Sequence, residues 1–405
     1  MIEKAELEEA RRLIEERGCA PGAEKVALPE AHGRVLAKDI TAPVDYPPFN
    51  RSPLDGYALQ AADTVGASPG APARLKVVDT VYAGGYSHKI VTGGIAVRLM
   101  TGSPIPEGAD CVIRQEDTRL EEGWVVIEKE LIPWENYCFR GENLRKGDTV
   151  LKKDSVLQAA AIGVLAGVGV AAVPVYKKPT AAVLSTGDEL IEPGTLPAPG
   201  QIYGSNLYTI ACRLKECGVN VLSTGILRDD SAAIGNAVAE AAGRADFIVT
   251  TGGVSAGEKD LMAAVMKGLG AEIVFRGVKI RPGSAVLFSV FGGKPVISLS
   301  GNPLASAVTF ELLLPSFLQK ITGNRSLERR TMQAVLQNDF DKKSPVRRAL
   351  RGKFWRDCEG KAVVEIIDHM HSSGNLTVAL KSNCYVDVEK GSTGLKRGEM
   401  VRIIV

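Results

Sequence analysis

Three short polar runs each follow a predicted β-strand, and residues in that position are suited to bind a ligand. They are residues 185–189 (STGDE), 251–257 (TGGVSAG) and 300–303 (SGNP). Because the carboxyl ends of parallel strands meet at one edge of a sheet, we expect all three runs to lie at the same rim. A lone glycine-rich run is about as often only a tight turn with positive φ, but three such runs together favour a binding site.

The second run has a composition that favours anionic oxygens as ligands. Its glycines leave backbone N–H groups unobstructed, and a predicted helix begins just after it. The spacing of Gly252, Gly253 and Gly257 is G-G-x-x-x-G, which is neither the dinucleotide fingerprint nor a P-loop. The sequence therefore predicts a cradle for phosphate groups.

Acidic residues are expected at the same rim, namely Asp188, Glu189, Asp229, Asp230 and Asp260. Carboxylates beside a phosphate cradle would repel the ligand unless a hard cation bridges them, so Mg²⁺ is implied. The alternative is helix capping, which we favour for Asp260 taken alone. For the acidic residues as a group we favour function.

The elements that position these runs alternate between apolar β-branched segments and helical periodicity from about residue 177 onward. This alternation predicts parallel βαβ units in one doubly wound α/β domain. We expect strands at residues 181–185, 219–226, 247–250, 285–289 and 295–299, and helices near residues 207–216, 232–242, 259–268 and 302–321.

Smaller modules flank this domain. A helix with Leu7, Ala10, Leu13 and Ile14 on one face opens the chain, and a Pro-rich linker at residues 43–53 leads to an all-β module. That module has strands at residues 75–78, 111–114 and 124–127, and a C-terminal β-domain has strands at residues 363–367, 376–380, 385–389 and 399–405. The uncharged segment 155–176 is long enough to cross a bilayer, but its Ala, Gly and Val content favours a buried helix followed by a strand.

Composition excludes several classes of protein. The 405 residues predict several domains, and a net charge of +2 without a long basic block gives no electrostatic case for nucleic acid. Seven cysteines without a C-x-x-C pair indicate reduced thiols and a cytoplasmic protein.

Taken together, the motifs resemble the MoeA family, the molybdopterin molybdenumtransferases, which are also similar to the E domain of gephyrin. The resemblance covers almost the whole chain and rests on SPLDGYA (52–58), TGSPIPEGADCVIRQE (101–116), GEN (141–143), LSTGDEL (184–190), TGGVSAGEKD (251–260) and SGNP (300–303). It implies a homodimer whose subunits have four domains: a linking domain (1–44 plus 146–176), a small β-domain (45–145), an α/β molybdopterin-binding domain (177–325) and a C-terminal β-barrel-like domain (326–405).

The resemblance also implies an activity. Such enzymes use Mg²⁺ to insert molybdate, or tungstate, into adenylylated molybdopterin and release AMP. The implied partners are molybdopterin adenylyltransferase and acceptor molybdoenzymes, with no role for a membrane. The family match carries over five site residues, namely Asp55, Thr101, Glu189, Asp229 and Asp260.

Further residues are expected to bind substrate. Asp229 and Asp260 would hold Mg²⁺, Glu189 would position the pterin or nucleotide end, and Arg281 with the backbone at Pro282 would bind molybdate, with Arg347 or Arg348 and Ser372 or Ser373 similarly placed. The rim runs complete the predicted substrate contacts with Thr186, Gly252, Gly253, Ser255, Gly257, Ser300, Gly301, Asn302 and Pro303.

The chain departs from the family pattern in ways that keep an alternative open. An arginine-rich R-x-G-E-D stretch that usually follows G-E-N is skipped between Gly141 and Asp148, the family's K-P-G-K-P reads RPGSA at residues 281–285, and Ala305 stands where a serine is common. The alternative is a carrier or scaffold that binds molybdopterin without turnover. A weaker third hypothesis is adenylylation of another small molecule.

Overall fold

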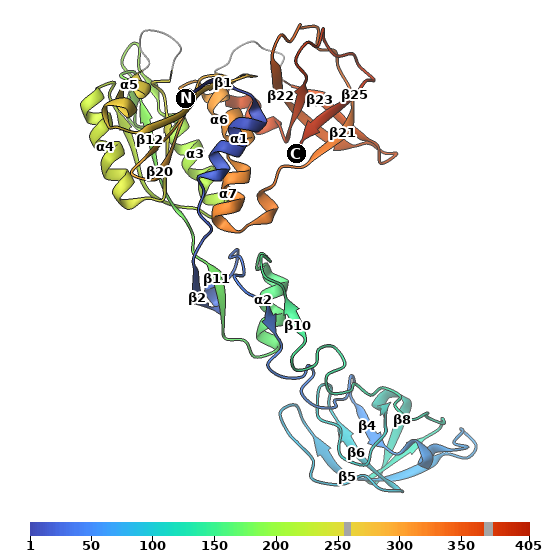
Figure 1. Ribbon diagram of the computed structural model, residues 1–405. Coiled ribbons are helices and arrows are strands. Elements are labelled where there is room, and N and C mark those ends of the chain that lie inside the picture. The colour runs from blue at the N-terminus through green and yellow to red at the C-terminus, as the bar shows by residue number, and fades with distance from the viewer. Residues whose placement is uncertain (255–260, 368–375) are drawn as a thin grey trace. The chain divides into compact units, whose positions relative to one another are not determined.

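The computed structural model describes residues 1–254, 261–367 and 376–405 (Figure 1). The chain divides into two compact units, which we describe separately. Unit 1 comprises residues 1–24, 33–37 and 174–405, and unit 2 comprises residues 25–32 and 38–173.

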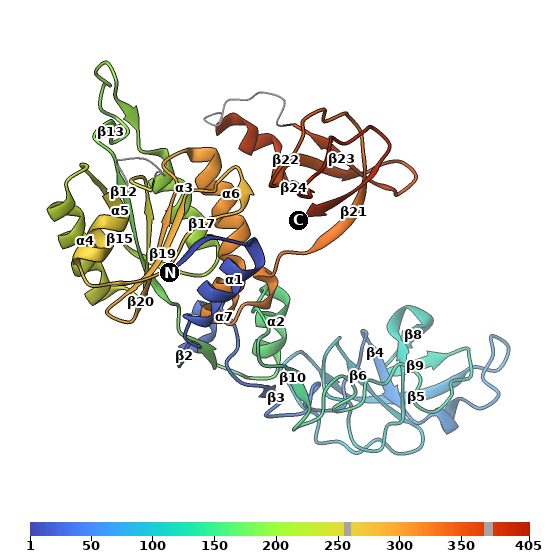
Figure 2. The same cartoon turned by 45° about the horizontal axis from the view of Figure 1, so that its top comes forward.

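Unit 1 is built on a seven-stranded sheet in the order β1-β17-β19-β20-β16-β12-β15 (Figure 2). Its strands are β1 (Ile2–Ala5), β12 (Thr180–Thr186), β15 (Asn220–Leu227), β16 (Phe247–Thr251), β17 (Glu272–Val278), β19 (Val286–Phe291) and β20 (Lys294–Leu299). Strands β20, β16, β12 and β15 are mutually parallel, as predicted. Strand β19 runs antiparallel to both of its neighbours, so the sheet is mixed rather than wholly parallel.

Helices cover both faces of this sheet, which confirms the predicted doubly wound class. Helices α1 (Leu7–Glu16), α3 (Ser205–Glu216), α6 (Pro303–Leu313) and α7 (Pro315–Thr322) contribute to one apolar core. Helices α4 (Ser231–Arg244) and α5 (Leu261–Gly268) contribute to the other. The predicted amphipathic first helix is confirmed, because Leu7, Ala10 and Ile14 are buried.

The single helix expected at residues 302–321 is wrong. The chain forms α6 and α7 instead, and the break falls at Pro315, the first residue of α7. Proline has no N–H for the helix ladder and its ring clashes with the preceding turn, so it starts a new helix here. Among the described residues no single helix could span a membrane, and only this pair, bent by 53°, satisfies the length and composition criteria when taken together.

The C-terminal part of unit 1 is a closed β-barrel. Its strands are β21 (Thr331–Leu336), β22 (Arg347–Arg356), β23 (Ala362–Ile366), β24 (Cys384–Val388) and β25 (Met400–Ile404), and the sheet closes where β24 pairs with β22. The predicted barrel-like domain is confirmed. The strand expected at residues 376–380 is wrong, since Leu376–Lys381 forms a 3₁₀ helix.

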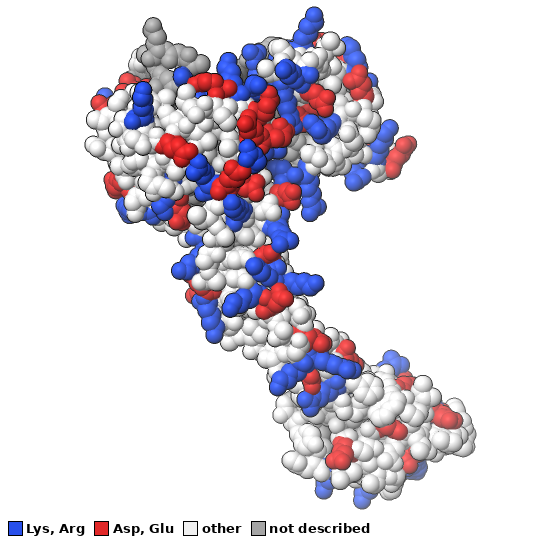
Figure 3. All heavy atoms as spheres, viewed as in Figure 1, with Lys and Arg blue, Asp and Glu red and all other residues white. Residues whose placement is uncertain are grey.

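Unit 2 contains a six-stranded sheet in the order β7-β4-β6-β5-β9-β8, which confirms the small β-domain. Its strands are β4 (Gly56–Leu59), β5 (Ala73–Val81), β6 (Ile95–Leu99), β7 (Cys111–Arg114), β8 (Thr118–Glu121) and β9 (Trp124–Ile127). The face drawn in Figure 3 carries few charged side chains over this sheet.

The uncharged segment 155–176 forms helix α2 (Ala159–Gly167) and strand β11 (Ala172–Tyr176), in the predicted order. The expectation of a buried helix is wrong, because Leu165 is its one buried residue and Val164 is 46% exposed. Alanine and glycine carry little apolar surface, so their exposure costs little free energy.

Candidate active site

The three polar runs meet at the carboxyl ends of β12, β16 and β20. A Cβ atom added to Gly252 would lie 2.2 Å from the carbonyl oxygen of Thr186, and one added to Gly301 would lie 3.4 Å from the Cα of Gly252. Gly252 and Gly253 also have φ values of +94° and +66°, in the region that favours glycine. The predicted meeting of the three runs is therefore present in the structure.

A buried hydroxyl lies under this glycine turn. The Oγ1 atom of Thr186 is inaccessible to solvent and has no hydrogen-bond partner. Its neighbour Ser185, by contrast, shares a 2.8 Å hydrogen bond with the hydroxyl of Thr251. Because an unpaired buried polar group costs free energy, the hydroxyl of Thr186 is a candidate ligand contact.

A cavity of about 50 Å³ opens beside the turn, and it is lined by four of the predicted residues, Thr186, Glu189, Gly301 and Pro303. Asn206 also lines it and donates from Nδ2 to the carbonyl oxygen of Gly301 at 2.8 Å. Sequence reasoning missed Asn206, because an asparagine near the start of a helix has no signal that distinguishes it from an ordinary turn residue.

The third run mainly serves the start of helix α6. Asn302 accepts a hydrogen bond at Oδ1 from the N–H of Ala305, and Ser300 accepts one at Oγ from the N–H of Asn302, both at 3.2 Å. These side chains cap the helix, and its N-terminus lies at the rim with Pro303 in its first turn. The helix dipole therefore favours an anion at this place.

The acidic residues divide into two groups. Asp230 accepts a hydrogen bond from the N–H of Ala233 at 2.6 Å and so caps helix α4, which is the alternative role considered for these acidic residues. Asp188 accepts from the N–H of Asp229 at 3.2 Å, which links the run after β12 to the turn after β15. The described residues contain no group of three metal-ligating side chains, and the predicted residues Ser255, Gly257 and Asp260 lie outside the described part of the chain.

In unit 2 the predicted residues Asp55 and Thr101 are joined. Thr101 donates from its backbone N–H and from its hydroxyl to Oδ1 of Asp55, each at 2.6 Å. The side-chain hydrogen bond and then the backbone one lower the pKa of Asp55 below its ordinary value. Asp55 is thus an ionised carboxylate with one oxygen already occupied.

The predicted oxyanion residues lie where the sheet domain meets the barrel. Strand β18 (Ile280–Arg281) pairs with β22, so that Arg281 lies opposite Arg348, and Pro282 follows in a cis peptide. Arg347 donates from Nε and Nη2 to Asp387, each at 2.7 Å, and is also paired with Glu8. The expectation that Arg347 binds an oxyanion therefore requires this neutralised pair to break, and Ser372 and Ser373 lie outside the described residues.

Arg351 also lies on β22, and unlike Arg347 it has guanidinium nitrogen atoms without hydrogen-bond partners. Arg351 is 4% exposed, and its Nε and Nη1 atoms are buried without hydrogen-bond partners. It lines a cavity of about 410 Å³ together with Arg213, Glu311 and Arg329. Glu311 pairs with the other two arginines, which leaves Arg351 as the cation of this group without a carboxylate among the described residues. Sequence reasoning missed Arg351 because only the fold shows its burial.

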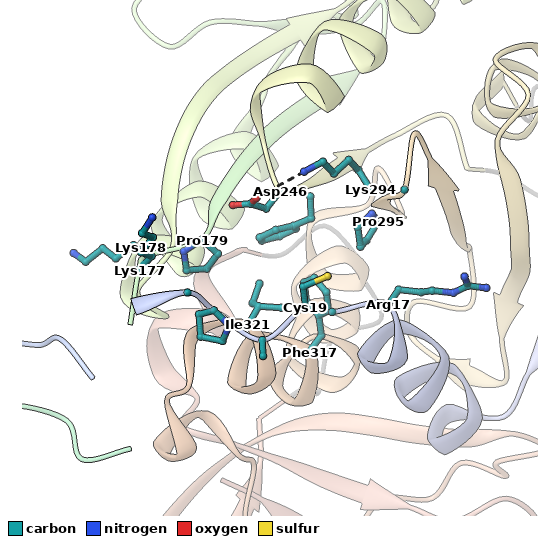
Figure 4. A pocket seen from close by; sticks show the side chains of 16 residues that line it. Arg17, Cys19, Lys177, Lys178, Pro179, Asp246, Lys294, Pro295, Phe317 and Ile321 are labelled. Carbon is teal, nitrogen blue, oxygen red and sulfur yellow. Dashed lines mark ion pairs between the residues drawn. The ribbon is translucent and has the colours of Figure 1, made fainter. Parts of the chain in front are cut away.

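A cavity of about 320 Å³ lies at the opposite, amino ends of β12, β16 and β20 (Figure 4). Its floor includes the buried side chains of Phe317 and Ile321, and the Asp246–Lys294 ion pair, 3.8 Å apart, crosses its edge. None of the predicted site residues lines it.

Comparison with known proteins identifies the class to which this fold and site belong. The family pattern described as "MoeA N-terminal region (domain I and II)" matches residues 5–169, "Probable molybdopterin binding domain" matches residues 182–320, and "MoeA C-terminal region (domain IV)" matches residues 333–405. The molybdopterin molybdenumtransferase of Staphylococcus aureus (strain COL) is 36% identical over 98% of this chain and 94% of its own length.

Relatives in other organisms agree. The molybdopterin molybdenumtransferase of Staphylococcus epidermidis is 35% identical over 94% of this chain and 90% of its own length. A crystal structure of the molybdopterin biosynthesis MoeA protein from Pyrococcus horikoshii matches with a TM-score of 0.81 and 30% identity, covering 99% of this chain and 100% of that one. The chain therefore belongs to the MoeA family, and the predicted enzyme class agrees with the names of these relatives.

Proposed function

We propose that the chain acts in molybdenum-cofactor biosynthesis, where it inserts molybdate or tungstate into adenylylated molybdopterin and releases AMP. The observation that carries this proposal is the cradle formed by Thr186, Gly252, Gly253 and Gly301, where a glycine turn covers an unpartnered hydroxyl. A phosphoanhydride offers the anionic oxygens that such a cradle and a helix N-terminus bind.

The residues around the cradle have separate roles in this proposal. Thr186 would donate to a phosphate oxygen, and the N-terminus of helix α6 would stabilise the charge there. Glu189, in the same cavity, would hold the pterin or nucleotide end of the substrate. Asp55, ionised and fixed by Thr101, would act as a base or orienting carboxylate.

The carboxylates at the rim suit Mg²⁺, a hard cation that prefers oxygen ligands. Asp229 and Asp260 would hold it, and Asp188 lies beside the backbone of Asp229. When bound, the ion would neutralise charge on the phosphate oxygens. Among the described residues, the hydrogen bond from the N–H of Asp229 to Asp188 holds the two segments together.

For the oxyanion, we add Arg351 to the predicted Arg281 and Pro282. Removing a buried guanidinium from water is costly unless an anion compensates it, and Arg351 has two unpartnered nitrogen atoms. A tetrahedral dianion would accept from both.

We also propose a cytoplasmic homodimer that meets molybdopterin adenylyltransferase and acceptor molybdoenzymes. The exposed, uncharged helix α2 is a surface that a second copy could cover. Sedimentation of the full chain should give a dimer, and a monomer would contradict this part of the proposal.

The test is AMP release from adenylylated molybdopterin with Mg²⁺ and either molybdate or tungstate, with Asp260→Asn as the control. Oxyanion-dependent release that collapses in the control would support an insertase and rank the two metals. Tight binding without AMP release from either oxyanion would instead support the carrier, to which the departures at residues 281–285 point.

A further inference from the structure

Three aromatic side chains form a cluster on the surface of unit 2, in the segment that follows strand β9. Trp134 lies with its ring centroid 5.1 Å from that of Tyr137 and 5.3 Å from that of Phe139, and the centroids of Tyr137 and Phe139 are 4.8 Å apart. Trp134 is nevertheless 54% exposed and Phe139 is 43% exposed. We call these three residues the aromatic cluster.

The backbone holds the aromatic cluster in a fixed place. The N–H of Trp134 donates to the carbonyl oxygen of Asp110 at 2.6 Å, and Asn136 donates from Nδ2 to the carbonyl oxygen of Val112 at 2.9 Å. Trp134 and Asn136 both have left-handed backbones, with φ values of +70° and +55°. This conformation is costly for a tryptophan, and core packing does not explain it, because the ring faces solvent.

The cluster is joined to the Asp55–Thr101 pair through adjacent backbone segments. Cys138, between two of the rings, exchanges hydrogen bonds with Arg51 at 2.9 and 3.1 Å. The next residue, Ser52, accepts from the N–H of Gly102 at 2.8 Å and donates to Ser103 at 3.0 Å. Backbone hydrogen bonds therefore connect the segment of the cluster to the segment before Asp55, and that segment to the one after Thr101.

We propose that the aromatic cluster stacks against a planar heteroaromatic ring of the substrate, either its pterin or its adenine. This inference rests on the proposed function, because adenylylated molybdopterin carries a flat ring system at each end. Aromatic rings with open faces bind such rings by stacking. Arg140, which follows Phe139, is paired with Asp45 at 2.6 Å, so this cation is already neutralised by a carboxylate.

A protein partner fits this surface less well. A stable protein interface buries roughly 800 Å² on each side, whereas the exposed rings of the cluster are those of Trp134 and Phe139. A partner chain is therefore an outcome of the test that would overturn the proposal.

The experiment uses the tryptophan itself as the probe. The full chain has three tryptophans, and Trp124→Phe with Trp355→Phe leaves Trp134 as the sole emitter. Titration with AMP and, separately, with 6-hydroxymethylpterin should quench this emission for at least one of the two. Trp134→Ala should weaken binding of the same probe by about 5- to 100-fold, measured by calorimetry, and Trp134→Phe should restore most of it.

Trp124→Ala is the matched control, because Trp124 is 39% exposed in strand β9 of the same unit but lies outside the cluster. Its probe affinity should equal that of the wild type. Absence of quenching by both probes, equal affinities in Trp134→Ala and wild type, or a changed oligomeric state in Trp134→Ala would each overturn the proposal.

Failure of this inference is distinguishable from failure of the proposed function. If AMP release occurs and Trp134→Ala leaves both KM and probe binding unchanged, the cluster has no role although the function stands. If no AMP is released but a probe still quenches Trp134, the function fails and the stacking site stands.

Discussion

Two cavities lie at opposite ends of the same parallel strands of unit 1, and they differ in both size and lining. The cavity at the carboxyl ends is about 50 Å³ and is bordered by a glycine turn, a helix N-terminus and the unpartnered hydroxyl of Thr186. The cavity at the amino ends is about 320 Å³ and has a floor of core side chains such as Phe317. The larger cavity contains none of the predicted site residues.

This difference shows that volume is a poor guide to chemistry in this fold. At the carboxyl ends, backbone N–H groups and helix dipoles point out of the sheet and favour anions. At the amino ends, Figure 4 shows the side chains of Lys177 and Lys178 directed away from the cavity, and the backbone N–H of Lys177 donates to the carbonyl oxygen of Gly22 at 2.8 Å. The candidate site is therefore distinguished by its glycine turn and its helix N-terminus rather than by the volume of open space beside it.

The largest expected effect comes from displacing the glycine turn beside the small cavity. Gly252→Ala would place a Cβ atom 2.2 Å from the carbonyl oxygen of Thr186 and force the turn to move. Because a displacement of about 1 Å at a reacting centre costs about 100-fold, AMP release should fall by at least that factor. Gly270→Ala is the control, since Gly270 also has a positive φ but an added Cβ meets nothing within 4 Å. Equal rates of AMP release in the two variants would contradict a role for the cradle in the reaction.

The next effect separates Arg347 from Arg351, both of which lie on β22. Arg351→Met should weaken molybdate binding about 10- to 100-fold without loss of stability, because the substitution removes a buried cation that has two unpartnered nitrogen atoms and no ion pair with a described carboxylate. Arg347→Met should lower the free energy of unfolding by about 3–5 kcal/mol, because Asp387 would lose a hydrogen-bonded partner. Calorimetric titration and urea unfolding measure the two quantities. A molybdate affinity lost only in a correctly folded Arg347→Met protein would restore the sequence-based choice.

A smaller effect should appear in the pH dependence. Thr101 lowers the pKa of Asp55, so Asp55 stays ionised to a lower pH than an ordinary aspartate. In Thr101→Val the pKa should rise toward its ordinary value, and the acid limb of the kcat/KM profile for AMP release should move to higher pH. An unmoved acid limb would show that activity does not depend on the ionised form of Asp55.

The smallest effect is expected at the larger cavity. Lys177→Ala combined with Lys178→Ala should change AMP release by less than about twofold, because these side chains touch none of the predicted site residues. A steady-state assay measures this directly. A large loss of activity would indicate that the cavity at the amino ends of the strands takes part in the reaction.

Much of unit 1 could be predicted from the sequence, because its buried strands are apolar runs and its helices are periodic. The rim also followed, since polar residues after parallel strands must share one edge. Strands β1 and β17 were missed because their sequences, IEKA and EIVFRGV, carry charges or a glycine. The pairing of Arg347 and the two unpartnered nitrogen atoms of Arg351 depend on contacts between distant segments, and neither has a local signal in the sequence.

The most direct test of the cradle compares two buried hydroxyls on neighbouring strands. Thr186 on β12 and Thr250 on β16 both have buried Oγ1 atoms without partners, but only Thr186 borders the small cavity. Thr186→Val should weaken AMP binding, measured by calorimetry, by about tenfold or more, the value of a hydrogen bond to a charged group. Thr250→Val should bind AMP as the wild type does. Equal AMP affinities in the two variants would contradict the claim that the carboxyl-end cradle binds the phosphate groups of the substrate.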